Sequence, residues 1–193
     1  MGRCSLGILL LIPVFASVGC ATSAKTMAMM PNPSQIQLVN HHSGSVEVAV
    51  SGGKETNPLW TSQISSQNFE QALSRAVQES EVFSAAAPSG QGAYRLDVAL
   101  GNTKQPMVGL AMTVGMTSHW KLSRTSDQAV VWQDTIQASY KAAFTEHVVG
   151  TERLRKANEG AARESIREGL KRLSNVQLDP GVQHVSGTAR VRQ

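Results

Sequence analysis

The side chains that could perform acid–base, nucleophilic or metal chemistry are few, and their spacing matches no catalytic pattern. His41 and His42 are adjacent, but a zinc site needs three or four ligands with a supporting shell, and no other cluster lies nearby in the sequence. Asp134 shares the parity of Trp132 and Ile136. A strand twist or a salt bridge to a nearby arginine explains it better than a catalytic acid. The serines occupy no nucleophile elbow. The sequence therefore predicts a protein that is not an enzyme and uses no cofactor or metal.

Cys20 has the clearest chemical meaning. It follows a basic start and an apolar run over residues 6–15, LGILLLIPVF. This run is about half the length of a membrane-spanning helix and is typical of a signal peptide. Val18-Gly19-Cys20 resembles the bacterial lipobox, in which the cysteine thiol is acylated and becomes the mature N-terminus, although Ser17 stands where Leu is usual. We predict a signal peptide over 1–19 and lipidation of Cys20. Ordinary cleavage after Gly19, which would give a soluble periplasmic protein, is the alternative.

The lipobox resemblance also implies a location. Gram-negative lipoproteins without Asp directly after the cysteine usually reach the outer membrane, and here that residue is Ala21. Several acyl chains make membrane attachment durable, whereas one alone is marginal. Because Cys4 would leave with the signal peptide, no thiol would remain for a disulfide or a nucleophile. We expect a lipid-anchored protein on the periplasmic face of the outer membrane.

Charge and composition limit the classes of partner and the domain organisation that the sequence can have. The chain carries 18 basic and 14 acidic residues, and loss of Arg3 with the signal peptide leaves about +3. This charge is too small to indicate a nucleic-acid partner, and no nucleic-acid-binding motif is present. Residues 20–37 are mostly small and polar, which predicts a lipidated N-terminus followed by a flexible tether. A single domain is expected over 38–178, and a flexible tail over 179–193.

Hydrophobic periodicity within 38–178 predicts an α+β fold. Alternation predicts strands near 46–50 and 94–100 and a long β-hairpin over about 107–145, with Trp120 and Trp132 on its apolar parity. Helical spacing predicts one helix that begins after Ser65 and continues through Phe83, and another that begins at about Thr151. The order of elements is β-α-β-β-β-α. We predict an antiparallel sheet with two helices on one face and the other face partly bare.

Two surface features are candidates for partner binding. The last helix buries the stripe Leu154, Ala157, Ala161, Ile166, Leu170 and Leu173 and carries a basic face of Arg153, Lys156, Arg163, Arg167 and Lys171. This face is either a solvated surface or a site for anionic lipid or an acidic partner. The loop that contains Leu59 and Trp60 either anchors a partner or covers the end of the core.

The segment SVGCATS, the tether, the order of elements and the hairpin segment HWKLSRTSDQAVVWQDTI together resemble small Gram-negative envelope lipoproteins. These include the lipopolysaccharide-assembly lipoproteins and the auxiliary lipoproteins of lipid-transporting ABC systems. The resemblance implies a non-catalytic accessory or assembly factor that binds an envelope protein partner. The alternative is a lipid or glycolipid binding module with a groove between helices and sheet.

Overall fold

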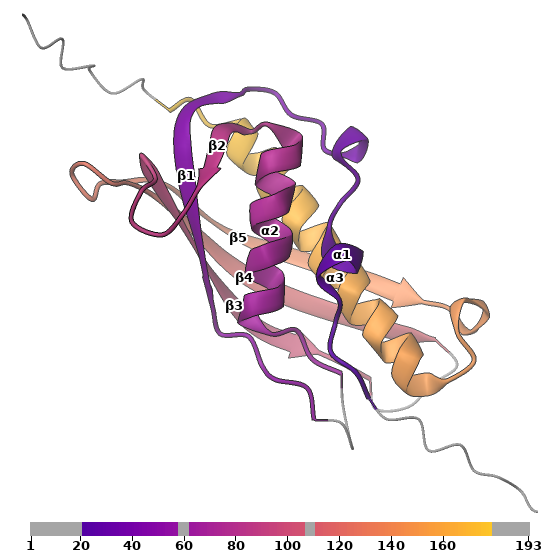
Figure 1. The fold of residues 1–193 in the computed structure, drawn as a ribbon. Coiled ribbons are helices and arrows are strands. Elements are labelled where there is room, and N and C mark those ends of the chain that lie inside the picture. The colour runs from indigo at the N-terminus through magenta and orange to yellow at the C-terminus, as the bar shows by residue number, and fades with distance from the viewer. Residues whose placement is uncertain (1–20, 58–61, 107–110, 179–193) are drawn as a thin grey trace, which may run out of the picture.

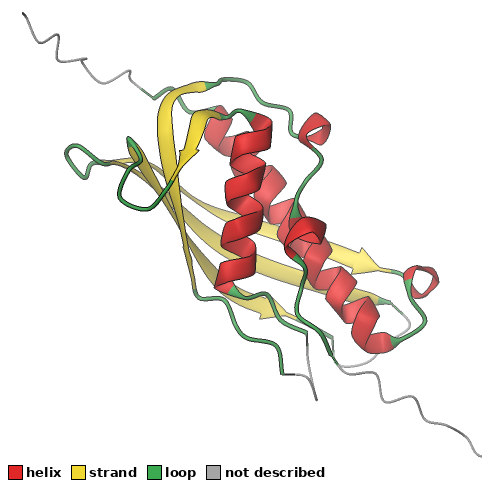
Figure 2. Cartoon of the chain, in the orientation of Figure 1, coloured by secondary structure: helices red, strands yellow, loops and turns green. Residues whose placement is uncertain are grey.

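The computed structural model describes residues 21–57, 62–106 and 111–178, and these form one α+β domain (Figures 1 and 2). Its two long helices lie on the same face of one sheet. The strands are β1 His42–Ser51, β2 Phe83–Ala87, β3 Tyr94–Lys104, β4 Met112–Arg124 and β5 Val130–Ala142. The long helices are α2 Ser66–Ser80 and α3 Gly150–Ser174. The short elements are α1 Thr26–Met29 and 3₁₀ turns at Pro33–Gln35 and Phe144–Glu146.

The sheet is mixed, with strand order β2-β1-β3-β4-β5. β1 runs parallel to both β2 and β3, whereas β4 runs antiparallel to both β3 and β5. The predicted antiparallel sheet is therefore wrong at β1. The physical reason is the connection, because a strand that returns to the same sheet through the crossover helix α2 pairs in parallel.

The extra strand β2 occupies a segment that the sequence assigned to the first long helix. That helix begins as predicted, with the Ser65 hydroxyl accepting a hydrogen bond from the Asn68 amide. It ends at Ser80, where Glu81 takes a left-handed conformation with φ of 58°. Phe83 is then buried in β2, and its ring lies 5.1 Å from that of His42 and 5.7 Å from that of Tyr94. The alanines after Phe83 favour a helix by propensity, and pairing with β1 overrides that preference.

The predicted long hairpin is confirmed over its described part. β4 and β5 pair from Met112 opposite Ala142 to Ser123 opposite Val130, and residues 107–110 lie outside the described residues. The predicted stripe of α3 is also buried. The helix packs closely on the hairpin at Gly169. A Cβ there would lie 2.4 Å from the Trp120 ring, so only glycine fits at this position.

The two tryptophans of the hairpin differ in burial. Trp120 is 1% exposed beneath α3, whereas Trp132 is only partly buried at the edge of the core. We predict that Trp120→Ala lowers the free energy of unfolding by about 3–5 kcal/mol, as expected for a large buried aromatic. Trp132→Ala should cost clearly less. Chemical denaturation of both variants tests this, and a larger loss at Trp132 would mean that the assigned packing of β5 is wrong.

Candidate functional site

Residues 21–37, which we call the N-terminal strap, lie along the two long helices (Figure 1). The flexible tether predicted here is therefore wrong for this described stretch. Ala24, Met29 and Ile36 belong to the hydrophobic core, and Met29 is fully buried. Periodicity does not predict this packing, because small and polar residues surround these apolar ones, which fall on no clear helical or strand period.

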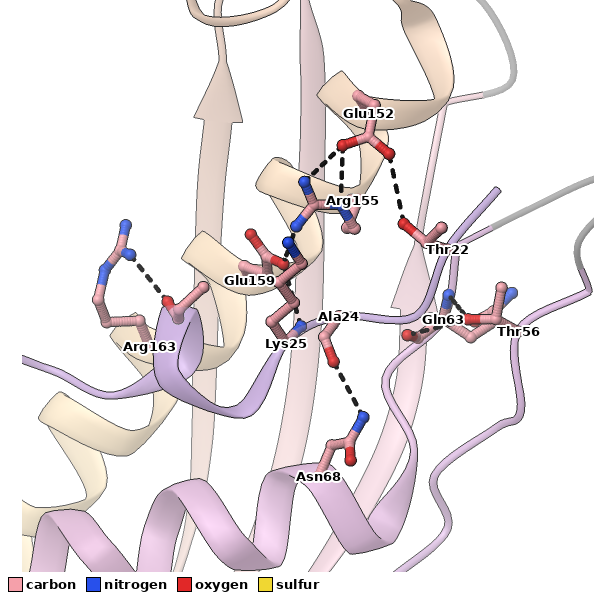
Figure 3. A network of polar contacts seen from close by, with 11 residues as sticks. Thr22, Ala24, Lys25, Thr56, Gln63, Asn68, Glu152, Arg155, Glu159 and Arg163 are labelled. Carbon is pink, nitrogen blue, oxygen red and sulfur yellow. Dashed lines mark hydrogen bonds and ion pairs between the residues drawn. The ribbon is translucent and has the colours of Figure 1, made fainter. Parts of the chain in front are cut away.

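Backbone groups of the strap form hydrogen bonds with both helices, as Figure 3 shows, and with the segment before α2. The Ala24 amide donates to the Gln63 carbonyl at 3.2 Å, and its carbonyl accepts from the Asn68 side chain at 3.0 Å. The Lys25 amide donates to Glu159 Oε1 at 3.0 Å. Because these are directional bonds to main-chain atoms, they fix the path of the strap and not only its burial.

A buried charge network on α3 supports the strap. Glu159 is 5% exposed, and Arg155, buried beside it, pairs with both Glu159 and Glu152 at 2.5 Å. The hydrogen bond from Arg155 lowers the pKa of Glu152, although burial opposes the shift. Thr22 Oγ1 donates to the other Glu152 oxygen at 3.3 Å. Glu152 therefore remains ionised at neutral pH, and Glu152 and Glu159 both accept hydrogen bonds from the strap.

The strap also determines where a lipid on Cys20 would be attached. Cys20 itself lies outside the described residues. Ala21 is buried, and Thr22 contacts the first turn of α3 through Glu152. Since consecutive Cα atoms are about 3.8 Å apart, a lipid on Cys20 would be joined to the docked strap without a spacer.

The five predicted cations of α3 do not form one free basic face. Arg153 is buried and donates to the carbonyls of His147 and Val148. Arg163 donates to the Ala28 carbonyl of the strap and lies over the Tyr140 ring. These two guanidiniums act within the domain, because α3 is covered by the strap as well as by the sheet. Arg167 pairs with Glu164 at 2.9 Å, and Lys156 and Lys171 are half-exposed.

The remaining predicted candidates have structural surroundings or lie outside the described ranges. Asp134 pairs with Arg172 at 3.1 Å, as the sequence interpretation favoured. His42 is buried, and its Nε2 lies 3.1 Å from the Leu173 carbonyl. Within residues 21–57, 62–106 and 111–178, no three histidine, cysteine or acidic side chains are grouped to hold a metal. Leu59 and Trp60 lie outside these ranges.

The sheet face opposite the helices is polar and hollowed. One hollow of about 720 Å³ is lined by residues of four strands, among them Asp97, His119, Lys121, Gln133 and Thr135. A second hollow of about 530 Å³ lies further along β4 and β5. Asp97 is contacted there by Arg95 at 2.9 Å and by Lys121 at 3.5 Å. The face thus offers hydrogen-bonding groups and charges of both signs.

Comparison with known proteins shows the fold and not the family. No protein-family model and no curated protein sequence matches the chain. A structure from Xanthomonas campestris, described by the family model DUF330, is 18% identical with a TM-score of 0.55, over 80% of this chain and 93% of its own. A hypothetical protein from Chlamydia trachomatis is 11% identical with a TM-score of 0.51, over 70% and 98%. A minor lipoprotein from Acinetobacter baumannii is 12% identical with a TM-score of 0.47, over 72% and 93%. The chain shares the α+β fold of the first two.

The first prediction from this site concerns Glu159. Glu159→Ala removes the acceptor of the Lys25 amide and one partner of Arg155, and hydrogen bonds to charged groups contribute about 1.5–3 kcal/mol. We expect trypsin to cleave after Lys25 at least about tenfold faster than in the wild type. Glu164→Ala is the control, because Glu164 pairs with Arg167 on the same helix. Equal cleavage in all three proteins would show that the strap does not depend on Glu159.

The second prediction concerns pH. Burial lowers the pKa of His42 below its usual 6.5. The hydrogen bond to the Leu173 carbonyl partly offsets this shift, and the nearby His41 adds to it. The unfolded chain therefore binds the proton first, so stability is highest above pH 6.5 and falls as the pH drops below it. His42→Gln should lose less stability on acidification than the wild type. Urea denaturation at about pH 7.5 and 5.5 measures the difference, and an identical loss in both proteins would contradict it.

Proposed function

We propose that this protein is a lipid-anchored, non-catalytic accessory protein of the Gram-negative cell envelope. The anchor is Cys20, which is acylated on its thiol and becomes the N-terminus when residues 1–19 are removed, and the domain faces the periplasm from the outer membrane. Val18-Gly19-Cys20 after a short apolar run supports the anchor. None of the helices described is long and apolar enough to span a bilayer. The accessory role agrees with the resemblance to lipopolysaccharide-assembly and ABC-auxiliary lipoproteins.

One observation favours an accessory role over a lipid-binding module. A lipid binder of this fold would need a groove between helices and sheet. Here that space holds buried side chains from both layers, among them Leu73 and Ile166 of the helices and Leu96 and Leu122 of the sheet. On the outer side of the helices the strap packs against both α2 and α3, with Met29 as its fully buried side chain. The hollows that stay accessible on the sheet are polar, which suits a protein surface better than acyl chains.

The open sheet face is accordingly the surface that we assign to the protein partner. Its occupant should be polar and should carry both charge signs, to complement Lys121 and Asp97. Exposed Thr135 and His119, hydrogen-bonded to each other at 3.0 Å, lie within it. A partner seated there would lie away from the strap, which is packed on the opposite layer.

The lipid anchor is tested by metabolic labelling. We predict that the wild type incorporates labelled palmitate and that Cys20→Ser does not, because acylation needs the thiol. A wild type without label would refute the anchor.

The partner surface is tested by a photo-cross-linking residue at Thr135 in the anchored protein, in cells. We expect it to capture one defined envelope protein. The matched control is the same residue at Gln71, which is exposed on α2 on the helical side. Capture from Gln71 and not from Thr135 would overturn the assignment of the open face.

A further inference from the structure

Three exposed apolar side chains gather directly before α3. Phe144 is 45% exposed, Val148 73% and Val149 42%. Single exposed apolar side chains are ordinary, whereas several together mark contact with another surface. We call residues 144–149 the apolar turn.

Contacts with Arg153 stabilise the conformation of the apolar turn. Buried Arg153 donates to the carbonyls of His147 at 2.8 Å and Val148 at 3.1 Å, and its guanidinium lies 5.3 Å from the centre of the Phe144 ring. Glu146 accepts from the Ala143 amide at 2.8 Å. The main chain therefore turns its polar groups inward to Arg153, while the valine side chains face outward.

The turn lies at the end of the domain that carries the start of the strap. Val149 immediately precedes α3, and Glu152 in the first turn of that helix contacts Thr22. Figure 1 shows the start of α3 and the beginning of the strap at the same end of the molecule. The Cα of Cys20 must be within about 8 Å of that of Thr22, because only two peptide units separate them.

We propose that the apolar turn is a second membrane contact, which enters the headgroup region of the bilayer that holds Cys20. This inference rests on the proposed lipidation of Cys20. Acyl chains on residue 20 bring the bilayer surface to this end of the domain, and the occupant most readily available to Val148 and Val149 is that surface. Two contacts fix an orientation that a single anchor leaves free. The strands then carry the β4–β5 turn, residues 125–129, away from the membrane, since 13 residues of β5 span roughly 40 Å.

Fluorescence quenching by lipid tests the orientation. The full chain is expressed with its signal peptide, purified in acylated form and reconstituted into phosphatidylethanolamine–phosphatidylglycerol vesicles that contain a brominated-acyl phospholipid. Thr145→Cys places a thiol-reactive fluorophore within the apolar turn, and Ser126→Cys places it on the β4–β5 turn. A label held about 5–10 Å into the headgroup and acyl boundary should lose most of its fluorescence, and one at Ser126 should lose none.

A triple variant distinguishes quenching caused by insertion of the apolar side chains from quenching caused only by closeness to the anchor. Phe144→Ser, Val148→Ser and Val149→Ser are combined in the Thr145→Cys protein, and we expect quenching to fall to the Ser126 level although the chain is still acylated. Equal quenching with and without the three serines, or none at Thr145, would overturn the membrane contact and leave the anchor intact. The protein without an introduced cysteine must take up no fluorophore. If it does, either Cys20 is not acylated or Cys4 has not been removed with residues 1–19, and the proposed anchor fails together with this inference.

Discussion

Glu159 is almost completely buried, and its pairing with Arg155 and the Lys25 amide organises the N-terminal end of the domain. An unpaired buried carboxylate is too costly to persist, so its partners are structural requirements. Arg155 supplies the opposite charge, and the Lys25 amide supplies a hydrogen bond from the strap. Strap docking and the satisfaction of Glu159 are therefore coupled. Because Ala24, Met29 and Ile36 are also buried, the strap is part of the core, and the chain from Ala21 onward has a fixed place on the domain.

The same packing gives the domain two unlike faces and two unlike ends. Helices and strap cover one face of the sheet, and glycine at position 169 lets α3 approach Trp120 closely. The other face keeps its polar side chains, with Asp97 and Lys121 among them. One end holds the start of the strap and the apolar turn, and the other holds the β4–β5 turn. With the proposed acylation of Cys20, this arrangement would present the open sheet face, which we assign to the protein partner, at a defined angle to the membrane.

The features that the sequence predicted are those with a strong period. Alternation over residues 112–124 and 130–142 identified the hairpin, and helical spacing identified the buried stripe of α3. Phe83 was misassigned because the alanines after it have no strand signature, and only pairing with β1 makes them a strand. Arg153 was predicted to face solvent because it is charged, but it is buried, and carbonyls of the preceding turn accept hydrogen bonds from its guanidinium. Burial of Met29 follows from tertiary packing, which no local pattern records.

The comparisons extend the fold to proteins of 18% and 11% identity, and they leave the function to be tested on this chain. The central claim is that the residues after Cys20 form a docked strap and not a free tether. Amide hydrogen exchange in the acylated wild type measures this most directly, because the amides of Ala24 and Lys25 donate to Gln63 and Glu159. We predict that both exchange slowly, with protection approaching that of α2. Exchange of both at the rate of an unstructured peptide would contradict the account.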